Sequence, residues 1–186
     1  MEIFDVVDID GNPTGETVGR DEAHDKGIKH RTAHVWVVRK EGENYEVLIQ
    51  KRAANKESFP GRFDTSSAGH IQKGDEPLES AIRELSEELG IFAKPFELDF
   101  AGKFDIQYEK EFYGKMFRDN EVSFVYVFMG IVDMGELKLQ EEEVESVEWF
   151  RLDEVVEECK SHNPKFCAPI GGLEILCRYL GLTELL

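Results

Sequence analysis

The chain has 186 residues, of which 41% are hydrophobic and 33% are charged, and its formal net charge is −17. This length suffices for one well-packed domain, and so acidic a chain is not expected to bind a nucleic-acid polymer, which requires clustered Lys and Arg on phosphates. We therefore expect a single domain over 1–186, with an N-terminal hairpin extension (1–30), a core (31–155) and a C-terminal helical tail (156–186).

The setting of the chain is predicted from its apolar runs and its cysteines. The first ten residues lack a basic region followed by a long apolar run, so we expect no signal peptide. No stretch approaches the roughly 18 apolar residues of a membrane helix, so no membrane partner is expected. The three cysteines lie in the C-terminal fifth without zinc-like spacing, which favours a reduced, cytoplasmic setting.

Taken in chain order, the elements alternate between strands and helices. Apolar alternation and turn residues predict strands at 3–9, 14–18, 33–38, 46–52, 97–108, 121–132 and 144–150. Helical periodicity predicts helices at 77–89, 152–159 and 171–181. Such a mixture indicates an α/β (α+β) fold.

The helix at 77–89 has the clearest start and end of the three. Pro77 suits a first helical turn, Asp75 is a plausible cap, and Gly90 suits the left-handed conformation that ends a helix. Four leucine and isoleucine residues form its buried stripe: Leu78, Ile82, Leu85 and Leu89.

Three glutamates, Glu84, Glu87 and Glu88, lie on the face beside that stripe. Like charges at these spacings repel each other by a few tenths of a kcal/mol. Carboxylates on a rigid helix match the oxygen ligands that Mg²⁺ prefers. The alternative is a solvated helix face with surplus acid.

The spacing of these residues resembles the Nudix box, the signature of hydrolases that cleave diphosphates linked to another group. The matching residues are Gly69, Asp75 in place of a glutamate, and the run Arg83-Glu84-Leu85-Ser86-Glu87-Glu88-Leu89-Gly90-Ile91. The resemblance implies the Nudix fold, a mixed β-sheet sandwiched between helices. It also implies Mg²⁺ or Mn²⁺ held by Glu84, Glu87 and Glu88 against a small-molecule diphosphate, with Arg83 bracing the box.

A wider similarity, over about 3–155, is to the branch that includes isopentenyl-diphosphate isomerases. It lies in the segments "DIDGNPTGETVGRDEAHDKGIKHRTAHVWVV", "QKRAANKESFPGRFDTSSAGH" and "RDNEVSFVYVF". The resemblance implies a second divalent ion, which suits Zn²⁺ or Mn²⁺, at His24, His30, His70, Asp119 and Glu121. The alternative for the histidines is solvation or capping in loops.

One position distinguishes an isomerase from a hydrolase. The isomerases carry an essential cysteine immediately before the Gly-His pair, and this chain has Ala68 there. We therefore favour a diphosphate hydrolase over an isomerase. A non-catalytic ligand sensor is a third alternative, opposed by the presence of all three box glutamates.

The remaining site residues are predicted with alternatives. The general base is Glu84 or a distal acid, Glu142 or Glu143. Three cationic residues precede the box: Lys51, Arg52 and Lys56. We expect them to bind the outer phosphates of the substrate; the alternative is that they are solvent-exposed side chains at the end of a strand. Gly69, with Gly74, lets the backbone approach a phosphate. We expect the segment 103–118 to form a specificity loop. The C-terminal helix closes the core or forms a homodimer contact.

Overall fold

The computed structural model describes residues 2–186. The strands are β1 (Ile3–Val7), β2 (Pro13–Gly19), β3 (His30–Glu41), β4 (Asn44–Arg52), β5 (Phe63–Asp64), β6 (Ser67–His70), β7 (Leu98–Phe112), β8 (Lys115–Phe128) and β9 (Val144–Arg151). The α-helices are α1 (Arg20–Lys26), α2 (Pro77–Leu89), α3 (Leu152–Lys160) and α4 (Ile170–Leu180). Two short 3₁₀ helices span Pro95–Glu97 and Thr183–Leu185.

A seven-stranded mixed sheet forms the centre of the molecule, in the order β5-β4-β3-β8-β7, with β6 paired to β3 and β9 paired to β4. Strands β3 and β8 run parallel, and the other pairs run antiparallel. The central position of β3 follows from its sequence, because a nearly continuous apolar run suits a strand that is covered on both faces.

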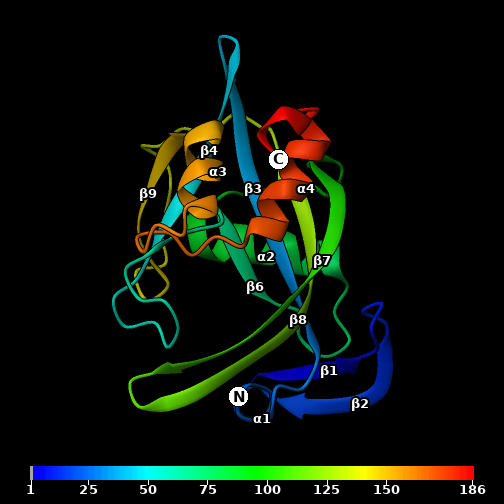
Figure 1. Cartoon of the computed structure of the whole chain (residues 1–186). Coiled ribbons are helices and arrows are strands. Elements are labelled where there is room, and N and C mark those ends of the chain that lie inside the picture. The colour runs from blue at the N-terminus through cyan, green and yellow to red at the C-terminus, as the bar shows by residue number, and fades with distance from the viewer. Residues whose placement is uncertain (1) are drawn as a thin grey trace.

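The two faces of the sheet carry separate hydrophobic cores. From β3, Val35 and Val37 point into one core, which α2 covers with Leu85 and Leu89. Trp36 points into the other core, which α3 and α4 cover. Figure 1 shows α3 and α4 in front of the sheet and α2 behind it. The expected mixed sheet sandwiched between helices is confirmed.

Strands β7 and β8 form a hairpin that continues well past the rest of the sheet and runs beside α1 (Figure 1). The prediction of a loop at 103–118 is wrong, because these residues pair from Lys103↔Phe124 to Phe112↔Lys115. The hairpin binds α1, since the Arg118 side chain donates to the Asp25 carbonyl at 2.6 Å. Helix α1 itself lies in a stretch where we predicted no element.

Helix α2 begins at Pro77 and ends before Gly90, as predicted, and Gly90 adopts a left-handed φ of 71°. The prediction that Asp75 caps the helix is wrong. The N-cap residue is Glu76, without a side-chain capping bond, because the Asp75 carboxylate pairs with Arg83 instead, at 2.6 Å.

The C-terminal helix α4 packs within the chain's own core, where Leu173, Leu176 and Cys177 are buried. No helix among residues 2–186 combines the length and apolar composition that a membrane-spanning helix requires.

Candidate active site

Three glutamates of α2, Glu84, Glu87 and Glu88, border one cavity of about 290 Å³. Glu87 is exposed and Glu88 is 5% exposed. The Glu88 carboxylate accepts hydrogen bonds from Gln50 Nε2 at 3.1 Å and from the Ala68 amide at 3.2 Å. Burial, reinforced by the charge of Glu84, raises the pKa of Glu88 to about 8. Without a bound cation, this carboxyl is therefore harder to ionise than an ordinary glutamate.

Arg83 fixes the wall of the cavity from the same helix. Its guanidinium donates to the Asp75 carboxylate at 2.6 Å, to Glu84 at 3.0 Å and to the His70 carbonyl at 3.1 Å. Aspartate therefore reaches the arginine despite being shorter than the usual glutamate. Burial raises the pKa of Glu84 although Arg83 opposes that shift.

Gly69 lies on β6, where it faces α2. A Cβ atom at this position would overlap with the carboxyl group of Glu84. The glycine leaves room for the Glu84 carboxylate, which Arg83 holds in this position. The predicted approach of a phosphate to Gly69 stays a prediction.

A second group of ligand atoms lies across the cavity. His24, His30, His70 and Glu121 each offer one atom within 4.8 Å of the others. Glu121 Oε1 lies 3.4 Å from His30 Nε2 and 3.5 Å from His70 Nε2. We call these four residues the histidine cluster. They come from α1, the first residue of β3, the last residue of β6, and β8.

Two histidine rings are oriented for metal binding by backbone carbonyls. His24 Nδ1 lies 3.0 Å from the Arg20 carbonyl, and His30 Nδ1 lies 2.8 Å from the Ile28 carbonyl. A carbonyl requires a donor, so each Nδ1 carries the proton and each Nε2 keeps its lone pair. Both Nε2 atoms are buried without a hydrogen-bond partner. These unpaired nitrogens fit a divalent ion with mixed nitrogen and oxygen ligands.

Burial and neighbouring charges favour the metal-binding forms of His24 and Glu121. Burial, followed by the charges of His70 and His30, lowers the pKa of His24 to about 3. Burial alone would raise the pKa of Glu121, but the neighbouring His30 and His70 side chains lower it well below its usual value. Neutral imidazole and carboxylate are the forms that bind metal.

Asp119 lies beside the histidine cluster but is more distant from it. Its Oδ1 atom is 3.9 Å from His24 Nε2 and has no hydrogen-bond partner. Burial and the charge of Glu121 raise the pKa of Asp119 to about 9.

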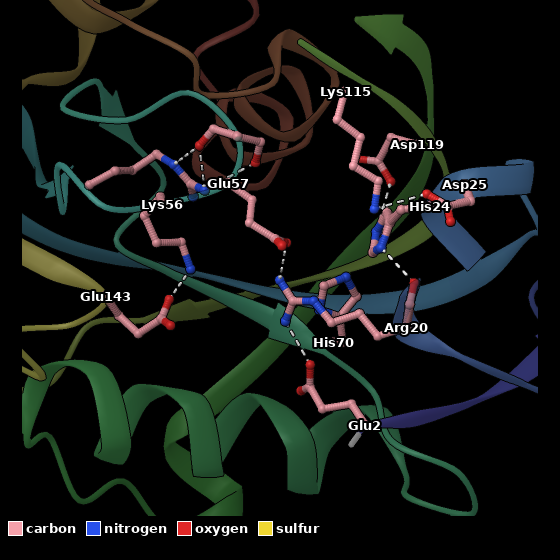
Figure 2. A network of polar contacts seen from close by, with 12 residues as sticks. Glu2, Arg20, His24, Asp25, Lys56, Glu57, His70, Lys115, Asp119 and Glu143 are labelled. Atoms are coloured by element: carbon pink, nitrogen blue, oxygen red, sulfur yellow. Dashed lines mark hydrogen bonds and ion pairs between the residues drawn. The ribbon is translucent and has the colours of Figure 1, made fainter. Parts of the chain in front are cut away.

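The predicted cations divide between the cavity and the surface. Arg52 lines the cavity, where it pairs with Asp64 at 3.1 Å and donates to the Ser58 carbonyl at 2.9 Å. Lys56 also lines it and pairs with Glu143 (Figure 2). Lys51 instead pairs with Glu145 at 2.7 Å and is not among the lining residues.

The two candidate distal bases, Glu142 and Glu143, also differ in whether they line the cavity. Glu143 lines the cavity, whereas its neighbour Glu142 is exposed and does not. Of the two, only Glu143 is placed to act on a molecule in the cavity.

Comparison with known proteins identifies the family. The sequence model of the NUDIX domain matches residues 28–168. The chain belongs to the Nudix family. An uncharacterized Nudix hydrolase of Clostridium acetobutylicum is 38% identical over 154 residues, which cover 83% of this chain and 72% of that protein. Nudix hydrolase 3 of Arabidopsis thaliana is 37% identical over 155 residues, which cover 82% of this chain but only 20% of that protein.

Among solved structures, DR0079 from Deinococcus radiodurans superimposes with a TM-score of 0.70. The match covers 96% of this chain and 99% of that chain, at 15% identity, and therefore supports the Nudix fold alone. The matching relatives are Nudix hydrolases, and this Nudix protein is a hydrolase.

Arg20 and Cys167 are among the cavity residues that the sequence did not predict. Arg20 pairs with Glu2 at 2.6 Å and Glu57 at 3.5 Å, and its carbonyl orients His24 (Figure 2). Cys167 enters the same cavity as Ala68 from the segment before α4. Burial and the charge of Asp64 raise the pKa of the Cys167 thiol. Nothing in the local sequence signals either placement, although the Arg20-to-His24 spacing of one helical turn is a weak hint.

Proposed function

We propose that this Nudix hydrolase cleaves the diphosphate linkage of a small organic diphosphate, with Mg²⁺ or Mn²⁺ bound by Glu84, Glu87 and Glu88. One observation carries the proposal: the box glutamates, three members of the histidine cluster (His24, His70 and Glu121) and three cationic side chains border a single cavity. The cations are Arg20, Arg52 and Lys56. Such a combination suits a ligand whose negative charge is shared between metal ions and basic side chains.

When bound, divalent cations would neutralise phosphate oxygens and favour attack by water at phosphorus. The chain's own residues prepare the site for this reaction. Arg83 holds Glu84 in place, and Gln50 and the Ala68 amide orient Glu88. Arg52, held by Asp64 and Ser58, presents a fixed positive charge to an outer phosphate.

A proton acceptor for the attacking water is available on either side of the cavity. Glu143 is one candidate, with Lys56 as its charged partner. Glu84 is the other, with Arg83 as its partner. The histidine cluster would hold a second divalent ion, for which the unpaired Nε2 atoms provide the ligands.

The test compares wild type with Glu88→Gln on a panel of diphosphates, with and without Mg²⁺ or Mn²⁺, by release of phosphate or phosphomonoester. The amide keeps the size of the side chain and removes its charge. We expect metal-dependent turnover of at least one diphosphate, reduced roughly 100-fold or more in Glu88→Gln. If folded wild-type protein binds Mg²⁺ and Mn²⁺ but turns over none of the diphosphates, the hydrolase proposal is contradicted.

The isomerase-type reaction is the second candidate, because the cavity contains a thiol despite Ala68. The thiol of Cys167 interacts with Asp64, and its raised pKa keeps it protonated. An assay for double-bond migration in a five-carbon allylic diphosphate distinguishes the candidates. Migration without phosphate release, lost in Cys167→Ala, would favour the isomerase.

A further inference from the structure

The loop of residues 53–62, between β4 and β5, is fixed over the cavity at three points. Lys56 pairs with Glu143 on one side, and Glu57 pairs with Arg20 on the other (Figure 2). Arg52 donates to the Ser58 carbonyl through two nitrogens, at 2.9 and 3.1 Å. These contacts place the next residue, Phe59, at the border of the cavity.

Phe59 has an unusual backbone conformation for its residue type. Its φ is 47°, in the left-handed region that bulky residues rarely adopt, and it precedes Pro60, which restricts it further. Such strain persists only where surrounding contacts hold the residue, and it is concentrated at functional sites. Glycine would adopt this conformation freely, so the presence of phenylalanine calls for a contribution from its ring.

The ring of Phe59 packs against the inner face of the β7–β8 hairpin. Its centroid lies 5.6 Å from that of Tyr108 and 5.0 Å from that of Phe112, with the rings at 62° and 75°. The ring of Tyr108 in turn stacks on that of Phe117, with centroids 6.3 Å apart. The Phe117 ring stacks on His24 of the histidine cluster, with centroids 4.4 Å apart. Aromatic side chains therefore continue from the loop to the histidine cluster.

The aromatic residues and the box glutamates come from different elements around the same cavity, and the loop and hairpin also contribute Glu57, Asp119 and Glu121. Phe59, Tyr108, Phe117 and Ile106 come from the loop and the hairpin, whereas the three box glutamates come from α2. A molecule whose diphosphate lies at α2 would direct its organic group toward the aromatic border. Aromatic faces favour apolar or flat groups over heavily hydroxylated ones.

We propose that Phe59, with Tyr108 and Phe117, forms the subsite for the organic group of the substrate and that this group is apolar or flat. The proposal rests on the diphosphate hydrolase function proposed above. A branched hydrocarbon and a flat heteroaromatic ring share the required chemistry. Phe59 is thus a specificity-determining residue on a loop that the charged contacts of Lys56 and Glu57 hold in place.

The experiment measures binding calorimetrically, in Mg²⁺, with non-hydrolysable analogues in which a methylene group replaces the bridging oxygen. The probes are methylenediphosphonate alone and its esters with dimethylallyl alcohol, a thiazole alcohol and a hexose. We expect wild type to bind the dimethylallyl or thiazole ester at least tenfold more tightly than the hexose ester. In Phe59→Ala this preference should fall roughly tenfold, whereas the affinity for methylenediphosphonate should change less than twofold.

Three further variants separate the ring from the backbone. Phe59→Gly removes the same ring and relieves the positive φ, so an equal loss of preference attributes the effect to the ring. Phe59→Leu keeps apolar volume without a flat face and distinguishes a hydrocarbon group from a heteroaromatic one. Phe92→Ala is the matched control, because Phe92 is 83% exposed and lies outside the cavity.

Two results would overturn the subsite while leaving the proposed function intact. One is binding of all esters no tighter than methylenediphosphonate, and the other is an equal weakening of every probe by Phe59→Ala. Failure of wild type to bind methylenediphosphonate in Mg²⁺ would instead overturn the diphosphate site, and the subsite with it.

Discussion

Glu142 and Glu143 are adjacent in sequence but have different surroundings, and this makes them a matched pair for locating the general base. Glu143 borders the cavity and pairs with Lys56, whereas Glu142 is exposed outside it. A well-placed general base contributes roughly 100- to 10,000-fold to the rate. We expect Glu143→Gln to lower kcat within this range and Glu142→Gln to change it less than twofold.

The pH profile of kcat distinguishes a base from a partner of Lys56. Loss of the base should remove the acidic limb of the profile, since that limb reports ionisation of the base. If Glu143 only positions Lys56, the amide will lower kcat while the acidic limb remains. An unchanged kcat in Glu143→Gln would assign the base to the box, with Glu84 as the remaining candidate.

Residues of the site differ in how far local sequence can locate them. Arg83 and the three glutamates follow from one helical motif, because a fixed spacing on a helix fixes their relative positions. Arg20 and Cys167 are far from that motif in sequence, and tertiary contacts bring them to the cavity. Lys51 and Glu142 belong to the predicted stretches, yet strand alternation and loop geometry direct them away.

At the scale of elements, α4 shows how an amphipathic helix covers the sheet. Its buried stripe, including Leu176 at 0% exposure, packs with α3 and with Trp36 of β3. Removing a fully buried leucine side chain costs about 2–5 kcal/mol. We expect Leu176→Ala to lower the free energy of unfolding by that amount in urea titrations.

Leu186→Ala is the control for α4, because Leu186 is 40% exposed and its truncation should cost less than about 1 kcal/mol. A small loss in Leu176→Ala that depends on protein concentration would contradict core packing. It would indicate that the buried stripe of α4 is exchanged between subunits.

The elements missed in sequence contained usable signals. The predicted specificity loop alternates inward residues such as Phe104 and Tyr108 with exposed ones such as Lys103 and Asp105. This period of two indicates a strand, which we predicted only as far as residue 108 because the charges beyond it obscured the pattern. Helix α1 is marked by a Glu22–Lys26 pair and by Gly27 at its end. Its seven residues are too few for a clear apolar stripe.

Across the whole molecule, the histidine cluster joins parts of the chain that are distant in sequence. His24 comes from α1, beyond the N-terminal hairpin, whereas the other three ligands come from strands of the central sheet. The fold therefore determines the site, because no spacing within one segment does. A metal ion bound here would connect the N-terminal elements to the sheet and stabilise the folded chain.

We expect removal of this metal to lower the melting temperature of the protein. At a free metal concentration about 100 times the Kd, binding contributes about 2.7 kcal/mol, which corresponds to roughly 5–10 °C in a chain of this size. Zn²⁺ or Mn²⁺ should restore the melting temperature after chelation. His30→Asn should lose about one equivalent of tightly bound metal by elemental analysis and should no longer respond to the chelator.

His162→Asn is the control for this measurement, because His162 lies outside the histidine cluster and asparagine tolerates its φ of 57°. It should retain both the metal and the response to the chelator. Equal metal content in wild type and His30→Asn would contradict a metal at the histidine cluster. The unpaired Nε2 atoms of His24 and His30 would then be buried without a ligand, an arrangement that is costly unless ordered water satisfies them.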